Sequence, residues 1–136
     1  MGKPILCLDF DGVIHGYTSG WQGVGIANDP PVPGTLEFLI EATKHFHVAV
    51  YSSRSKSFAG RQCMRAYVRE HFYMPLTFSP DHEHDWLHEA VSYPWFKPPA
   101  LITIDDRALT FTGDWADFST DRLRTFKPWN KRERVG

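Results

Sequence analysis

The sequence predicts an α/β protein, a three-layer α/β/α domain whose central sheet is mostly parallel. Two observations lead to this fold class. Short apolar runs, which are typical of buried parallel strands, alternate with longer segments whose apolar residues recur at helical intervals. Strands and helices that alternate in this way form a parallel sheet with helices on both faces. The 136 residues are enough for one domain with a single packed core.

The first half of the chain contains the clearest elements. The first predicted strand is the apolar run of residues 5–10, which ends in two acids and a glycine. Residues 12–34 are rich in Gly and Pro, and we expect a loop or a small hairpin there, which we call the flap. Residues 35–46 space their apolar side chains as a helix does, and residues 47–51 form the second predicted strand.

The second half continues the alternation and ends in a basic stretch. The predicted elements are, in chain order, a helix over 58–72, a strand over 76–78, a helix over 82–91, a strand over 101–104 and a strand over 109–112. Residues 1–126 are therefore expected to form one domain, and residues 127–136 a basic tail.

Composition and charge exclude several classes of protein. An apolar share of 42% and an aromatic share of 15% are those of a globular chain, not of a disordered one. The net charge of −1 gives no overall attraction to nucleic acid, although a local patch can still contact it. Cys7 and Cys63 are expected to be reduced thiols. The apolar run near the N-terminus is too short for a signal peptide or a membrane span, so we expect a cytoplasmic protein without a membrane partner.

Polar side chains follow three of the predicted strands, and the carboxyl ends of parallel strands meet at one edge of a sheet. These side chains are Asp9 and Asp11 after the first strand, Ser52 and Ser53 after the second, and Asp105 and Asp106 after the fourth. Carboxylates this close repel one another unless a cation lies between them. Ligands that are all oxygen favour Mg²⁺ over zinc.

Each polar group also has a simpler interpretation. The acids can be solvated loop residues, and Ser52 and Ser53, which are also suited to hold an anion, can be an ordinary helix cap. Tyr17 and Trp21 of the flap can stack on a base or a sugar, but packing of the loop is the favoured interpretation. The histidines and acids of residues 82–88 can hold a metal, but an exposed helix start is favoured.

Taken in order, these segments resemble the haloacid dehalogenase (HAD) superfamily of phosphotransferases. Leu8-Asp9-Phe10-Asp11-Gly12-Val13-Ile14 is similar to the first motif of that superfamily, Val48-Ala49-Val50-Tyr51-Ser52 to the second, and Ile102-Thr103-Ile104-Asp105-Asp106 to the fourth. The resemblance covers residues 5 to about 112 and implies a Rossmann-like domain. The chain has room for a flap but not for the cap domain that other members insert.

The resemblance implies a role for each motif residue. Asp9 is expected to be the nucleophile that forms an aspartyl-phosphate. Asp11 is expected to protonate the leaving oxygen and then to deprotonate the attacking water. Asp9, the backbone carbonyl of Asp11, and Asp106 are expected to hold Mg²⁺, with Asp105 nearby or bound through water. Ser52 is expected to hydrogen-bond the transferring phosphoryl group.

The superfamily also places a lysine beside the phosphate, and Lys97-Pro98 is similar to that third motif. Lys97 lies only a few residues before the fourth strand, which places it at the opposite end of that strand from the acids unless the chain folds back. Another cation can replace it. Arg54, Lys56 and Arg107 are the alternatives, since each lies just past one of the polar groups.

The sequence thus predicts a Mg²⁺-dependent phosphomonoester hydrolase with an open site, able to admit a small or a macromolecular substrate such as a nucleic-acid end. The alternative is a phosphate-binding or regulatory module with little turnover, which the unplaced lysine keeps open. A bacterial receiver domain also uses acids on such a sheet. We set it aside because there the adjacent acid pair follows the first strand, whereas here it follows a later one.

Overall fold

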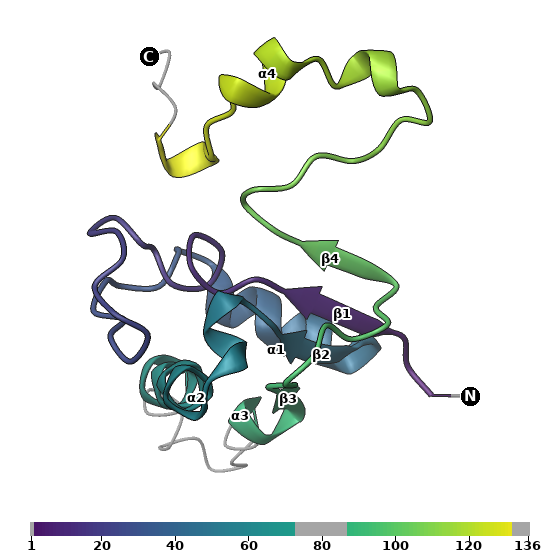
Figure 1. The fold of residues 1–136 in the computed structure, drawn as a ribbon. Coiled ribbons are helices and arrows are strands. Elements are labelled where there is room, and N and C mark those ends of the chain that lie inside the picture. Colours follow the sequence, from purple (N-terminus) through teal and green to yellow (C-terminus); the bar gives the residue numbers. More distant parts are fainter. Residues whose placement is uncertain (1, 73–86, 132–136) are drawn as a thin grey trace.

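The computed structural model describes residues 2–72 and 87–131, which contain a parallel sheet flanked by helices (Figure 1). The strands are β1 Ile5–Leu8, β2 His47–Val50, β3 Val91–Ser92 and β4 Ile102–Ile104. Their order in the sheet is β3-β2-β1-β4, and all three pairings are parallel. Because β1 lies between β2 and β4, the residues that follow these three strands meet at one edge of the sheet.

Helices and short helical turns fill the connections. They are α1 Thr35–His45, the turn η1 Ser53–Lys56, α2 Phe58–Phe72, α3 Leu87–Ala90, the turn η3 Trp115–Asp117, α4 Thr120–Arg124 and the turn η4 Trp129–Lys131. Within residues 2–72 and 87–131, no helix is both long and apolar enough to cross a lipid bilayer.

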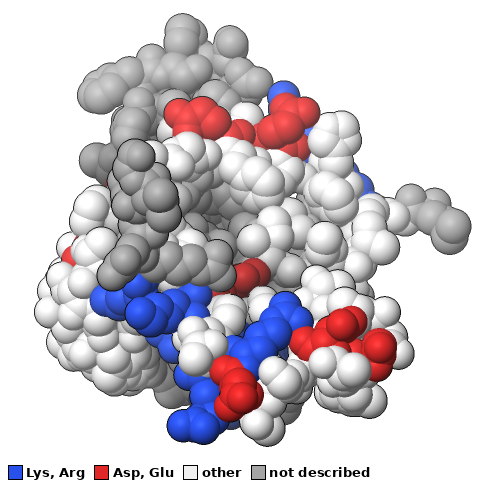
Figure 2. Space-filling model, turned by 90° about the horizontal axis from the view of Figure 1, so that it is seen from above, with Lys and Arg blue, Asp and Glu red and all other residues white. Residues whose placement is uncertain are grey.

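The charges on the surface are unevenly distributed. Figure 2 shows the molecule from above, with most of the visible Lys and Arg side chains in one band and Asp and Glu side chains in several smaller groups, some of them beside that band. The formal net charge of −1 therefore conceals a locally basic surface.

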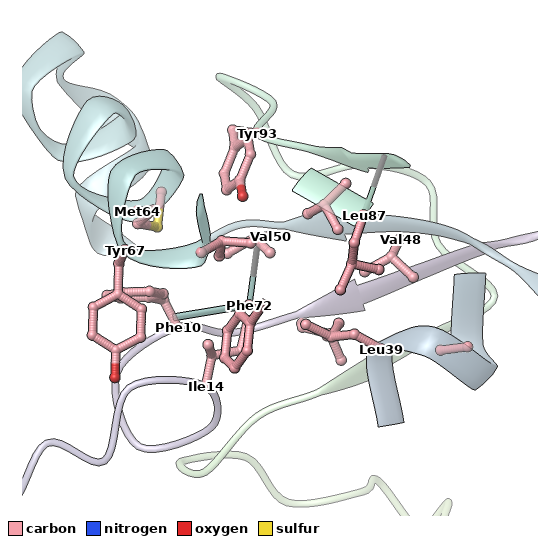
Figure 3. Close-up of a cluster of buried hydrophobic side chains, with 14 of the residues drawn as sticks. Phe10, Ile14, Leu39, Val48, Val50, Met64, Tyr67, Phe72, Leu87 and Tyr93 are labelled. Carbon is pink, nitrogen blue, oxygen red and sulfur yellow. The ribbon is translucent and has the colours of Figure 1, made fainter. Parts of the chain in front are cut away.

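One core joins the sheet to the first three helices. Leu6, Leu8, Val48 and Val50, which alternate along β1 and β2, are at most 3% exposed. They pack in one cluster with Leu39 and Ala42 of α1, Met64, Tyr67, Val68 and Phe72 of α2, and Leu87 of α3 (Figure 3). Because strand residues with the same orientation contact all three helices, α1, α2 and α3 lie on one face of the sheet.

The opposite face of the sheet is formed by the intervening residues, among them Cys7, Ala49 and Thr103. Cys7 and Ala49 are buried, whereas Thr103 in the edge strand β4 is exposed. Cys7 and Cys63 are both free thiols, as expected. After β4 the chain runs away from the sheet and returns with η4 toward the loop that follows β1 (Figure 1). The indole Nε1 of Trp129 there donates a hydrogen bond of 2.7 Å to the Gly12 carbonyl.

Most predicted elements of the described chain are confirmed, and the class is α/β with a parallel sheet. The helix over 58–72 is α2, and the helix over 35–46 ends one residue early as α1. The strand over 109–112 is wrong, because this segment has no strand partner and is exposed. The helix over 82–91 is wrong at Val91, which pairs with β2 in β3.

Some predictions fall outside the described residues. These are the strand over 76–78, the start of the helix over 82–91, the side chains of the polar cluster at 82–88, and the end of the basic tail at 132–136. A third layer on the second face of the sheet is not shown, since α4 lies apart from the strands in Figure 1.

Candidate functional site

Three carboxylates meet at the carboxyl ends of β1 and β4. The ligand oxygens of Asp9, Asp105 and Asp106 all lie within 4.8 Å of one another. Leu8 of β1 pairs with Ile104 of β4, so the residues that follow each strand are neighbours. A hydrogen bond of 3.0 Å from the Asp9 N–H to the Ile104 carbonyl continues this register past the strands. The pairing of β1 with the edge strand β4 is therefore what brings the acids together.

The three carboxylates have few compensating contacts besides those of Arg107, whose N–H donates to Asp105 at 2.8 Å and whose Nε lies 3.9 Å from Oδ2 of Asp106. Burial, with the nearby Asp105 and Asp106, raises the pKa of Asp9 to about 8, although a hydrogen bond from the Phe10 N–H opposes the rise. Burial also raises the pKa of Asp106, whose side chain is 3% exposed. Its Oδ1 atom is buried and accepts no hydrogen bond from the described residues. An unpartnered buried oxygen among repelling acids fits the binding of a divalent cation.

Gly12 allows the loop after β1 to pass directly against Asp106. Its φ angle is 82°, in the left-handed region that favours glycine. A Cβ atom at this position would lie 2.2 Å from Oδ2 of Asp106. The glycine of the first motif is therefore required twice, by the backbone conformation and by the space that Asp106 occupies.

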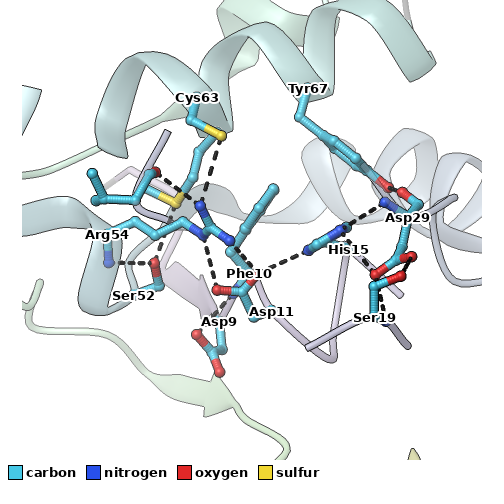
Figure 4. Close-up of polar contacts among 12 residues, drawn as sticks. Asp9, Phe10, Asp11, His15, Ser19, Asp29, Ser52, Arg54, Cys63 and Tyr67 are labelled. Carbon is cyan, nitrogen blue, oxygen red and sulfur yellow. Dashed lines mark hydrogen bonds and ion pairs between the residues drawn. The ribbon is translucent and has the colours of Figure 1, made fainter. Parts of the chain in front are cut away.

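Asp11 is not one of the clustered carboxylates, because Arg54 and His15 hold it on the flap side (Figure 4). Arg54 donates from Nε to Oδ2 at 2.9 Å and from Nη2 to Oδ1 at 3.1 Å, and His15 Nδ1 lies 2.8 Å from Oδ1. Burial favours a higher pKa for Asp11, but the hydrogen bonds from His15 and Arg54 outweigh it and lower the pKa. In this structure Asp11 is an ionised carboxylate with both oxygens engaged.

Arg54, one of the predicted phosphate-binding cations, instead joins Asp11 to the flap. Its side chain is 0% exposed. Besides Asp11, it donates from Nη1 to the carbonyls of Gly23 at 3.0 Å and Val24 at 2.8 Å. The guanidinium carbon also lies 4.7 Å from the centroid of the Trp21 ring. The ring of Trp21, for which packing of the loop was the favoured interpretation, thus packs on an arginine in this structure.

His15 is a site residue that the sequence analysis does not single out. It is 2% exposed, and its Nε2 accepts a hydrogen bond of 3.1 Å from the Asp29 N–H. The proton of the neutral ring is therefore on Nδ1, which donates to Asp11. Asp29 in turn accepts hydrogen bonds from the backbone N–H and the hydroxyl of Ser19, at 2.9 and 2.6 Å. The sequence feature that could have identified His15 is its position four residues after an acid in a glycine-rich loop.

A cavity of about 340 Å³, the Asp9 cavity, opens at the clustered acids. It is lined by Cys7, Asp9, Tyr51, Ser52, Ser53, Lys97, Thr103, Asp105 and Arg107. Because Cys7 and Thr103 lie on the sheet face opposite the core, the cavity opens on that face. Lys97 reaches it because the connection between β3 and β4 crosses this face. Lys56 does not line the cavity, whereas Arg107 does.

Ser52 lines the Asp9 cavity and also caps η1, so both sequence interpretations apply to it. Its hydroxyl accepts a hydrogen bond of 3.0 Å from the Arg54 N–H and lies 3.3 Å from the sulfur of Met64. Ser53 is exposed and has its side chain free of these capping contacts. Of the two serines, Ser53 is the more accessible to a ligand in the cavity.

No protein-family model matches the chain, and comparison with curated proteins and with solved structures gives no match either. The function of the site is therefore inferred from its own residues and their geometry.

Proposed function

We propose that this protein is a Mg²⁺-dependent phosphomonoester hydrolase of the HAD type, in which Asp9 is the nucleophile. The observation that carries the proposal is the cluster of Asp9, Asp105 and Asp106, two of which, Asp9 and Asp105, line a cavity together with Lys97 and Arg107. Carboxylates and cations together suit a site for a phosphoryl group and a metal. The strand order and the position of the site at the carboxyl ends support a three-layer, Rossmann-like domain without a cap.

The metal in this proposal is held by Asp9, Asp105 and Asp106. Oxygen ligands suit Mg²⁺, and the unpartnered Oδ1 of Asp106 supports a cation there. Bound Mg²⁺ would neutralise charge on the phosphoryl group and align it with the nucleophile.

Residues of the chain supply the nucleophile and the groups that compensate the phosphoryl charge. A carboxylate oxygen of Asp9 attacks phosphorus, and the bond from phosphorus to the leaving oxygen breaks as the acyl phosphate forms. Lys97, Arg107 and the hydroxyl of Ser53 line the cavity and compensate the charge of the phosphoryl oxygens. Water then attacks phosphorus, which releases inorganic phosphate and restores the Asp9 carboxylate.

Asp11 is proposed as the proton donor and acceptor, and the structure defines what that role requires. Both of its oxygens are hydrogen-bonded to Arg54 and His15. To reach a leaving oxygen, Asp11 must exchange at least one of these bonds for the substrate. Because Arg54 also binds the flap carbonyls of Gly23 and Val24, we propose that the flap moves as Asp11 is released.

Turnover of an aryl phosphate tests the proposal. With Mg²⁺ present, Asp9→Asn is expected to lower kcat by more than about 10³-fold. Asp121→Asn removes an exposed acid of α4 and is expected to leave kcat unchanged. A chelator is expected to abolish turnover in the wild type. Turnover that survives Asp9→Asn would remove Asp9 from the role of nucleophile.

A second candidate function is a phosphate-binding module with little turnover. The observation that favours it is the full engagement of Asp11, both of whose oxygens are hydrogen-bonded to Arg54 or His15 in this structure. This function predicts that inorganic phosphate binds to the Asp9 cavity but that no phosphorylated nucleotide, oligonucleotide, sugar or peptide is hydrolysed. Hydrolysis of any of these compounds that is lost in Asp9→Asn would exclude it.

A further inference from the structure

The arginines of α2 form a basic stripe along one side of that helix. Arg61, Arg65 and Arg69 follow one another at intervals of four residues and therefore share a face. Arg61 and Arg65, together with Phe58 and Gln62, line a second pocket of about 210 Å³. No carboxylate in the described part of the chain forms an ion pair with these arginines. Within residues 2–72 and 87–131, these arginines therefore form a group of positive charges without an acidic partner, which suits an anionic ligand.

Packing holds the two pocket arginines in place. Arg61 donates from Nε to the Tyr93 carbonyl at 2.7 Å, and its guanidinium carbon lies 4.1 Å from the centroid of the Trp95 ring. The guanidinium carbon of Arg65 lies 5.4 Å from the centroid of the Tyr93 ring. Guanidinium groups that are already ordered lose less entropy when a ligand binds. The pocket is therefore preorganised for phosphate groups.

Two stretches of chain connect this pocket to the Asp9 cavity. Ser53 lines the cavity, and Phe58 lines the pocket just beyond η1. On the other side, Trp95 packs on Arg61 of the pocket, and Lys97 lines the cavity. The residues that line the two sites are therefore only a few positions apart in the chain at both places, so one chain-like ligand can contact the cavity and the arginines of α2.

Exposed aromatic rings lie among these cations. Phe58 is 65% exposed, Trp95 is 44% exposed and Phe96 is 83% exposed. Cations that neutralise phosphates, interleaved with rings on which bases stack, are the combination that binds single-stranded nucleic acid. An acidic peptide would use the cations but would leave the exposed rings without a function.

We infer that Phe58, Arg61, Arg65, Trp95 and Phe96, here called the α2 surface, bind single-stranded nucleic acid whose phosphorylated end occupies the Asp9 cavity. The inference rests on the proposed function, since it names the substrate class of that same site. The surface contacts the phosphodiester backbone and the bases, while the cavity takes the terminal phosphate. A ligand of this kind would use both the basic residues of α2 and the proposed metal site.

Fluorescence anisotropy with a labelled single-stranded oligonucleotide that carries a terminal phosphate tests this inference. The protein is the Asp9→Asn variant in Mg²⁺ buffer, so that the probe is not hydrolysed. Adding Arg61→Gln and Arg65→Gln is expected to raise Kd about tenfold or more and to reduce the slope of log Kd against log salt by about 1. Adding Phe58→Ala, which removes only an exposed ring, is expected to raise Kd several-fold.

The matched control is the pair Lys3→Gln and Lys44→Gln, which removes the same charge from the opposite end of the sheet. It is expected to leave Kd within about twofold, because two distant charges act only through the screened net charge. Binding that weakens equally in both double variants, or that is tighter for a phosphorylated acidic peptide, overturns the inference. Wild-type turnover of an aryl phosphate is measured in parallel. Its absence counts against the proposed function, whereas turnover without oligonucleotide binding counts against the α2 surface alone.

Discussion

At the residue scale, Arg54 shows how a buried charge is tolerated in this fold. A fully buried guanidinium is costly unless its donors are satisfied. Here Asp11 accepts two hydrogen bonds from Arg54, and the carbonyls of Gly23 and Val24 accept two more. The sequence placed a cation at this position but did not specify its partner, because a carboxylate 43 residues away in the chain is a tertiary contact.

Replacing Arg54 tests the importance of this contact for stability. Arg54→Met removes the two N–H groups that donate to the Asp11 carboxylate. Because this leaves a partly buried charge without its partner, we expect the free energy of unfolding to fall by about 3 kcal/mol. Urea unfolding followed by circular dichroism measures the change. Lys56→Met is the control, because Lys56 is exposed and its loss is expected to cost less than about 0.5 kcal/mol. Equal stability of the two variants would contradict the structural role of Arg54.

Gly60 is a second residue whose identity is fixed by space. A Cβ atom there would lie 1.9 Å from the carbonyl oxygen of Arg54. Gly60→Ala therefore forces η1 and α2 apart, and we expect a loss of about 2 kcal/mol or more in thermal or urea unfolding. Gly25→Ala serves as the comparison, since no atom lies within 4 Å of its added methyl group. A stable Gly60→Ala protein would show that η1 and α2 pack less closely than described.

At the scale of elements, the flap over 12–34 is fixed by Asp29 as well as by Arg54. Hydrogen bonds from Ser19 lower the pKa of Asp29 below its ordinary value of 3.8. The ionised form is therefore the one that stabilises the folded state. Its contribution is complete above the pKa of the unfolded chain and is lost as the pH falls through the lower, folded pKa.

The pH dependence of stability tests this account of the flap. At pH 6 the wild type is expected to unfold at higher urea concentration than Asp29→Asn. The difference is expected to shrink as the pH falls below about 4, because the wild-type carboxyl group then becomes protonated. Urea midpoints of both proteins at matched pH values measure it. A difference that stays constant down to pH 3 would show that the charge of Asp29 is irrelevant.

The predictions of secondary structure are confirmed where the local sequence pattern and the tertiary structure agree. Helix α2 has helical periodicity over its whole length and matches its prediction. The segment 109–112 has the composition of a strand but no partner, and Phe111 instead packs against Trp115 and Phe118. Chain length alone left the position of Lys97 open, because it could not show that this lysine, which follows β3, lines the Asp9 cavity.

The candidate site was likewise predictable from the sequence only in part. The cluster of Asp9, Asp105 and Asp106 was predictable, because the ends of parallel strands meet at one edge of the sheet. The acids directly follow β1 and β4, which pair with each other. The orientation of Asp11 and the contribution of His15 were not predictable, because they depend on how the flap folds over the first motif.

At the scale of the whole molecule, the two faces of the sheet have different surroundings. One face carries the helices and the core, and the other carries the Asp9 cavity. The segment that follows β4 returns to the site, where Trp129 binds the carbonyl of Gly12. The returning segment thus contacts the loop in which Gly12 lies against Asp106.

The central claim is that Asp9 carries the phosphoryl group during turnover. The most direct measurement is the mass of the protein after acid quenching during turnover of a phosphorylated substrate with Mg²⁺, followed by peptide mapping. We predict a gain of one phosphoryl group on the peptide that contains Asp9, and no gain in Asp9→Asn. Turnover with the phosphoryl group on another residue, or with no phosphorylated protein under conditions that preserve acyl phosphates, would contradict the account.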